Sequence, residues 1–252
     1  MSVVKRIKSI LSSGGIRGLM MATQSYLAHH SILIHALAAC RTQYYRHICG
    51  YNAVAAPFAL LEVDPNSITH SNRSINKYYE SGTIRGGEWD LECSLYEQSN
   101  KYRSVRQRFV DGKSWEETDI HPILSEKIER TGEADGCFSR ADLKDRYERI
   151  DRLYESMSTY GYDPTRGTES QGSRLSSTLD HICVSIGRNG EFVFCGGGNH
   201  RFSIAKILEI ESIPVRVVIR HTKWQQKRED VAAGTVPEVT HPDLQKLYAK
   251  PT

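Results

Sequence analysis

The first quarter of the chain lacks acidic residues. Residues 1–61 hold six Lys or Arg side chains and no Asp or Glu, whereas the other 191 residues carry 27 bases against 30 acids. The start of the chain is therefore a distinct basic zone, suited to phosphates, anionic lipid or an acidic partner. An organellar transit peptide is the alternative, which we rank lower because no cleavage pattern follows.

The chain also lacks an uninterrupted apolar run. The stretch LMMATQSYLAHHSILIHALAAC at 19–40 has spanning length, but polar side chains interrupt it, and this argues against a transmembrane helix. A helix packed against the rest of the protein is the preferred alternative, and a helix lying on a membrane is the other. Four histidines in and after this stretch show no zinc-ligand spacing. They are His29, His30, His35 and His47.

Paired cysteines are absent as well. The six cysteines contain no CxxC pair, which gives no support to a zinc ribbon or a disulfide framework. We therefore expect reduced, mostly buried thiols and a cytoplasmic protein, peripheral to a membrane only if the basic region binds one.

One helix stands out in the middle of the chain. Apolar residues recur at spacings of four and three between 139 and 162, and Ser139 is a plausible N-cap. Earlier, Ser114 and Glu117 match a capping box, and His121-Pro122 is expected to stop or redirect that helix. Residues 163–177 have the composition of a surface loop.

A compact β-rich block follows that loop. The runs 181–187 and 191–195 flank Asn189-Gly190, a strong hairpin signal. A glycine loop, a helix at 201–210 and an alternating strand at 213–221 come next. Far earlier, the LLEVDP stretch at 60–65 is expected to be a strand.

The glycine loop carries the clearest functional signal. Its sequence is GGGNHR, Gly196 to Arg201, between a strand and a helix. Backbone amides at the start of a helix attract phosphate oxygens, and His200 and Arg201 would add donors. We expect phosphate contacts from Gly196, Gly197, Gly198, Asn199, His200 and Arg201. The alternative is a tight structural turn. The loop matches neither a Walker A motif nor a dinucleotide fingerprint.

The segment GGGNHRFSIAKILEIESIPVRVVI resembles the core of the ParB/sulfiredoxin superfamily. In that family a G-x-H-R loop opens a helix with an A-x-x-L spacing and leads to an IPV strand, matched here by Gly198, His200-Arg201, Ala205, Leu208 and 213–215. The match covers about residues 180–221, with LLEVDP as a weaker anchor. The resemblance implies a nucleotide site for ATP or another nucleoside triphosphate, with Mg²⁺.

Two departures from the family narrow the function. Asn199 stands where sulfiredoxin has its cysteine, and Cys195 lies on the preceding strand, so repair of sulfinic acid is not expected. Only 31 residues follow His221, too few for the DNA-binding module of the partition proteins.

The GGEWD stretch offers candidate acids for chemistry on a phosphate. Glu88 and Asp90 could hold Mg²⁺ or act as a general base toward a hydroxyl, with His200 as a further catalytic candidate. Equally, Trp89 could be a core anchor between two solvated acids. Both interpretations stay open at the level of the sequence.

Three functions follow from these observations. The first is an ATP-dependent phosphotransferase or nucleoside triphosphate hydrolase acting on a small hydroxyl-bearing or other acceptor. The second is a non-catalytic, nucleotide-gated module whose basic residues 1–56 contact nucleic acid or an anionic membrane surface. A ParB-like nuclease ranks lowest, because no cluster of metal-binding acids adjoins a basic cleft.

The expected fold class is α+β. We expect a small mixed-sheet core of the ParB/sulfiredoxin type, with a helical insertion and an additional N-terminal helical region. The expected division is 1–56 for the basic helical region, 57–98 for the first part of the core, 99–170 for the helical insertion and loop, 171–222 for the nucleotide-binding part and 223–252 for a C-terminal tail.

Overall fold

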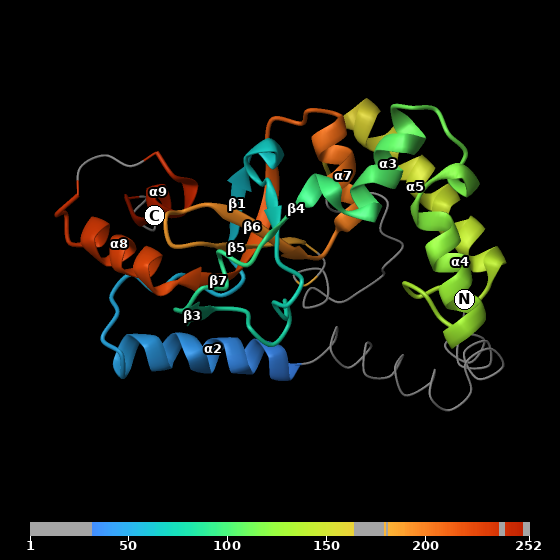
Figure 1. Cartoon of the computed structure of the whole chain (residues 1–252). Coiled ribbons are helices and arrows are strands. Elements are labelled where there is room, and N and C mark those ends of the chain that lie inside the picture. Colours follow the sequence, from blue (N-terminus) through green and yellow to red (C-terminus); the bar gives the residue numbers. More distant parts are fainter. Residues whose placement is uncertain (1–31, 164–178, 180, 237–239, 249–252) are drawn as a thin grey trace. The chain divides into compact units, whose positions relative to one another are not determined.

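The computed structural model describes residues 32–163, 179, 181–236 and 240–248, and Figure 1 shows its helices and strands. The chain divides into two compact units. In the described ranges, one unit holds residues 99–163, and the other holds 32–98 together with 179–248. The basic residues before 32 and the predicted loop at 163–177, apart from Asp163, lie outside the described residues.

A mixed sheet of seven strands forms the centre of the larger unit. The strand order is β1-β7-β5-β6-β2-β4, and β3 pairs with the second half of β7. Parallel pairs (β5 with β7, β2 with β6, β3 with β7) alternate with antiparallel ones (β1 with β7, β5 with β6, β2 with β4). The predicted α+β class with a mixed sheet is confirmed. The bounds are β1 Leu60–Val63, β2 His70–Ser71, β3 Thr83–Arg85, β4 Ser94–Leu95, β5 Ile182–Ile186, β6 Phe192–Gly196 and β7 Ile213–His221.

The strand β7 is buried on both faces. The alternation of Ile213, Val215, Val217 and Ile219 predicts one apolar face, and all four are buried. The residues between them are enclosed as well, because β7 lies inside the sheet and chain segments cover both sides. The second face includes two buried arginines, Arg216 and Arg220, and therefore depends on specific polar partners.

The predicted Asn189-Gly190 hairpin is confirmed. It joins β5 and β6, which pair antiparallel, and Gly190 has a φ of 99°. A Cβ on Gly190 would lie 2.6 Å from the ring of Trp224. Glycine is therefore required at this turn for both its backbone conformation and its close packing.

Helices and short 3-10 turns cover the sheet (Figure 1). The helix α2 confirms the expected N-terminal helix, and α8 and α9 follow β7 at the C-terminal end. Among the described residues, no helix combines the length and apolar character that crossing a bilayer requires. The bounds are α2 Ile32–His47, η1 Pro65–Ser67, η2 Tyr96–Gln98, α7 Asn199–Ile207, α8 Thr222–Ala232 and α9 Pro242–Tyr248.

The second unit is a bundle of helices around aromatic contacts. Its longest helix, α5, confirms the predicted one: Ser139 caps it, and its Oγ accepts a hydrogen bond from the backbone N–H of Asp142. Trp115 stacks on Tyr147 with ring centroids 4.4 Å apart. The bounds are α3 Asn100–Phe109, η3 Trp115–Glu117, α4 Ile120–Thr131 and α5 Arg140–Tyr160.

The capping box at Ser114 and Glu117 is confirmed, but the role expected for Pro122 is wrong. The capping box opens only the single 3-10 turn η3. Pro122 then lies in the first turn of α4 instead of ending a helix. Proline is compatible with that position, because the first amides of a helix have no intrahelical acceptor.

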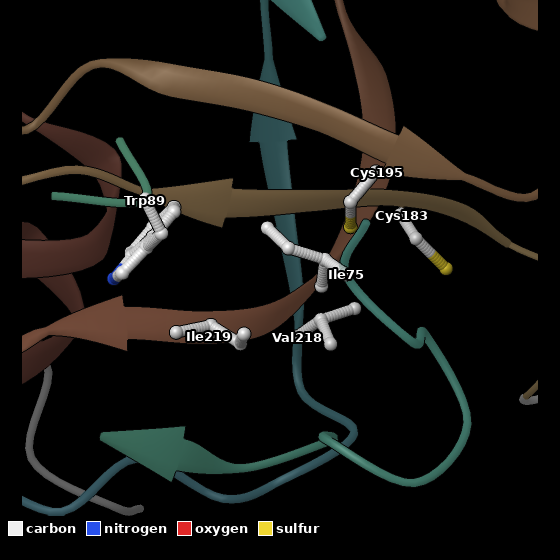
Figure 2. Packing of buried hydrophobic residues seen from close by; sticks show 6 residues of the cluster. All are labelled: Ile75, Trp89, Cys183, Cys195, Val218 and Ile219. Carbon is white, nitrogen blue, oxygen red and sulfur yellow. The ribbon is translucent and has the colours of Figure 1, made fainter. Parts of the chain in front are cut away.

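Burial of the cysteines differs from the expectation. All six are free thiols, but only Cys137, Cys183 and Cys195 are buried, and Cys40 and Cys49 are exposed. Figure 2 shows two of the buried ones in an apolar cluster, where they lie with side chains from β7 and from the segment after β2. The cluster comprises Ile75, Trp89, Cys183, Cys195, Val218 and Ile219.

Candidate functional site

The glycine loop joins the end of β6 to the start of α7. Gly196, Gly197 and Gly198 have φ values of 127°, 69° and 54°, where a residue with a Cβ is strained. A Cβ on Gly197 would overlap the carbonyl oxygen of His181, and one on Gly198 would lie 2.9 Å from Ile182 Cγ1. Backbone conformation and close packing on β5 both require glycine here.

A β-bulge lies directly before the loop. Cys183 pairs with Gly196 while Val184 pairs with Phe194, so Cys195 is an extra residue on β6. A bulge bends its strand and changes the direction of the residues that follow. Here it precedes the turn into α7.

Two cationic side chains lie against the three glycines, one from the start of α7 and one from a distant part of the chain. Arg201, in the first turn of α7, places its Nε and Nη2 atoms 3.5 Å and 3.7 Å from the position that a Cβ on Gly198 would take. The Cδ atom of Lys77 lies 3.4 Å from the corresponding position on Gly196. Arg201 was predicted from the sequence. Lys77 was not, because nothing in its local sequence signals proximity to a loop far along the chain.

The segment that carries Lys77 is held by the buried Arg216. The Nη2 atom of Arg216 donates to the carbonyl oxygen of Lys77 at 3.1 Å and to Cys183 Sγ at 3.0 Å. Its Nη1 atom donates to Ser81 Oγ at 2.6 Å, and that hydroxyl donates in turn to the carbonyl oxygen of Lys77 at 2.9 Å. Arg216 therefore fixes the backbone from which Lys77 reaches the loop.

The helix α7 is anchored by polar contacts at both ends. The hydroxyl of the buried Tyr96 donates to Asn199, at 3.0 Å from Oδ1, and lies 2.8 Å from Ser203 Oγ. Near the other end, Lys206 Nζ donates to the carbonyl oxygens of Pro65 and Ile68. Asn199 thus contributes its side-chain oxygen to the attachment of the helix. His200, beside it in the first turn, is half-buried.

The acidic candidates lie at the other end of β6. Asp90 pairs with Arg188 in the β5–β6 hairpin: its Oδ2 accepts from the backbone N–H and Nε of Arg188, and its Oδ1 accepts from Nη2 at 2.8 Å. Five residues, 191–195, separate that hairpin from the glycine loop, a distance of about 17 Å. The structure therefore does not bring Asp90, or the exposed Glu88 two residues before it, to the loop.

Asp90 is strongly held in its charged form. Burial of the carboxyl opposes ionisation, but the hydrogen bonds from Arg188 outweigh this and lower the pKa of Asp90 to about 2. Trp89 between the two acids is buried, and its indole N–H donates to the carbonyl oxygen of Arg85. Trp89 is thus the core anchor of the second interpretation. That interpretation is wrong about Asp90, which is buried instead of solvated, whereas Glu88 is exposed.

The arrangement at the loop suits an anion. Of the side chains that lie against it, Lys77 and Arg201 are cations, and Ile182 and Cys183 are uncharged or apolar. The start of α7 adds the positive end of a helix dipole. Among the described residues, no group of three or more His, Cys, Asp or Glu side chains could hold a metal ion.

Comparison of the chain with protein-family models, curated proteins and solved structures finds no match.

Proposed function

We propose that this chain is a nucleotide-binding protein of the ParB/sulfiredoxin type, with the phosphates of a nucleoside triphosphate at Gly196–Arg201. The observation that carries the proposal is the convergence of Lys77 and Arg201 on a glycine loop that opens a helix. Backbone amides at a helix start, a guanidinium fork and an ammonium group are the donors that phosphate oxygens accept from.

The geometry favours binding over phosphoryl transfer. Transfer needs a group that positions or deprotonates the acceptor, and the expected carboxylates, Glu88 and Asp90, lie at the far end of β6. His200, in the first turn of α7, is the remaining candidate for that role. The proposed function is accordingly a nucleotide-binding module, and turnover is a separate question for experiment.

Calorimetric titration with ATP, ADP, CTP and GTP, each with and without Mg²⁺, tests the proposal. We expect saturable binding by the wild type, and at least tenfold weaker binding by Arg201→Ala and by Lys77→Gln, because each variant removes one phosphate donor. Lys223→Gln makes the same charge change at an exposed position of α8 and is expected to bind normally.

Release of inorganic phosphate, measured in the same samples, separates binding from turnover. A chain that binds no nucleotide, or that binds equally well without Arg201 and Lys77, would contradict the proposal. The glycine loop would then be a structural turn required only by its packing on β5.

A further inference from the structure

The helix α2 is apolar on two faces, and among the described residues the larger unit covers only one of them. Ile34, Ala38 and Thr42 are buried. The hydroxyl of Tyr45 exchanges hydrogen bonds of 3.0 Å with the backbone of Ile84, the central residue of β3. Figure 1 shows α2 alongside that strand. This face is committed to the larger unit.

A second face, next to the buried one, carries an exposed apolar stripe. Leu33, Leu37 and Tyr44 are 59%, 38% and 53% exposed, and Ile48, just past the helix end, is 74% exposed. Cys40 between them is exposed as well. From Leu33 to Tyr44 the spacings are four, three and four, which is the seam spacing of paired helices. A contiguous apolar stripe of this kind marks an interaction surface.

Charge on α2 favours a protein partner over a membrane or nucleic acid. The helix contains no acidic residue and no lysine. Of its two arginines, the half-buried Arg41 donates to the carbonyl oxygen of Ser81, and the exposed Arg46 donates to that of Val54 at 3.4 Å. A membrane-surface helix displays Lys and Arg beside its apolar face. The centre of a protein interface, in contrast, is poor in charge and rich in aromatic residues such as Tyr44.

The stripe is complementary to itself. About a two-fold axis beside Cys40, an antiparallel pair of α2 helices places Leu37 of one copy against Tyr44 of the other, and Leu33 against Ile48. The same orientation keeps the two Arg46 side chains at opposite ends of the pair, whereas a parallel pair would bring these like charges together. Isologous contacts of this type are the commonest form of protein dimer.

We propose that the stripe formed by Leu33, Leu37, Cys40, Tyr44 and Ile48 is a homodimer interface, in which α2 packs antiparallel against α2 of a second copy with Cys40 beside the two-fold axis. One helix of 16 residues is about 24 Å long, and an interface of that length is small. We therefore expect a reversible dimer with a micromolar dissociation constant.

Cysteine cross-linking tests the geometry of the pair. Diamide joins two thiols as a disulfide and takes up both hydrogens as it is reduced to the hydrazine. Cys49 is exposed like Cys40, but in the proposed pair it lies roughly 25 Å from its counterpart. We expect a cross-linked dimer from Cys49→Ser, which retains Cys40, and at least tenfold less from Cys40→Ser. Equal cross-linking of the two variants would overturn the proposal.

Sedimentation under reducing conditions tests the contact without a covalent link. Leu37→Glu should raise the dimer dissociation constant at least tenfold and leave the melting temperature unchanged, because the buried face of α2 is untouched. Leu91→Glu, which changes a leucine outside α2 that is more exposed than Leu37 (60% against 38%), should dimerise normally. A wild type that is monomeric at several hundred micromolar would reject the proposal.

Vesicles of phosphatidylglycerol and phosphatidylcholine test whether a membrane, instead of a second copy, covers the stripe. If the wild-type chain stays monomeric but sediments with these vesicles, and Leu37→Glu does not, the stripe faces a membrane and the dimer proposal fails. If neither protein sediments with the vesicles while the wild type dimerises, the second copy is the occupant.

Discussion

Gly197 and Gly234 share a backbone conformation but have different surroundings. Their φ values are 69° and 72°; a Cβ would overlap the carbonyl oxygen of His181 at Gly197 and meet nothing within 4 Å at Gly234. Gly197→Ala should therefore lower the free energy of unfolding by about 3 kcal/mol, and Gly234→Ala by about 1 kcal/mol. Urea denaturation of the two variants measures the difference. Equal losses would show that the close contact with β5 costs nothing.

The ion pair between Asp90 and Arg188 predicts a dependence of stability on pH. The pKa of Asp90 is about 2 in the folded protein, below the value of about 3.9 for an unfolded Asp. Folding therefore favours the ionised form. Its contribution, about 2 kcal/mol, is complete above the unfolded pKa and is lost as the pH falls through about 2.

Asp90→Asn removes this contribution. We expect the difference in unfolding free energy between the wild type and Asp90→Asn to be constant above pH 5 and to shrink between pH 4 and pH 2. Urea denaturation at several pH values measures it. A difference that does not change down to pH 2 would mean that Arg188 does not stabilise the Asp90 carboxylate.

At the scale of the element, the helix α9 is attached by one buried carboxylate. Asp243 accepts hydrogen bonds from Arg220 of β7, from Trp224 Nε1 of α8 at 3.0 Å, and pairs with Arg228 at 2.7 Å. Burial opposes its ionisation, but the two guanidinium groups outweigh that and hold the pKa of Asp243 far below its usual range. One residue thus joins three elements.

Asp243→Ala would leave two buried cations without their counter-ion. We expect a loss of about 3–5 kcal/mol of unfolding free energy, the usual cost of breaking a buried ion pair on one side. Denaturant unfolding measures it. Asp230→Ala removes a carboxylate that is only half-buried on α8 and serves as the control, with an expected loss below about 1 kcal/mol. Equal losses would contradict this role for Asp243.

Elements with strong local signals were predictable. The periodicity of α5, its Ser139 cap and the Asn-Gly hairpin each depend on residues within a few positions of one another, and all three were found where expected. The start of α4 was not predictable, because a proline such as Pro122 is compatible with both the end of one helix and the start of the next. Only the packing of α4 on its neighbours distinguishes the two.

At the scale of the whole molecule, charge is unevenly distributed along the chain. Residues 1–61 carry +6, and the remainder carries −3. If this region binds nucleic acid, the logarithm of the affinity should fall with the logarithm of salt concentration with a slope no steeper than about −5, because six cations can neutralise at most six phosphates.

Replacing Lys5, Arg6, Lys8 and Arg17 with Gln leaves two cations, so the slope should then be no steeper than about −2. Fluorescence anisotropy of a labelled DNA duplex, recorded from about 20 to about 200 mM salt, measures the slope. Absence of binding at the lowest salt would exclude nucleic acid as the partner of the basic region.

The candidate site was only partly predictable. Gly196–Arg201 are contiguous, so their residue types alone indicate a turn before a helix and donors for an anion. The positions of Lys77 and Asp90 could be learned only from the fold. Arg216 holds the segment that brings Lys77 to the loop, and Arg188 holds Asp90 at the far end of β6. No local pattern encodes contacts between residues about 100 positions apart.

The α+β class, the hairpin, the longest helix and the glycine loop follow from the order of the residues, because each depends on short-range sterics and periodicity. The tertiary structure alone decided that Arg216 and Arg220 are buried, which partners satisfy them, and which face of α2 is left exposed. A buried charge is stable only where the fold supplies its partner, and that partner comes from a distant segment.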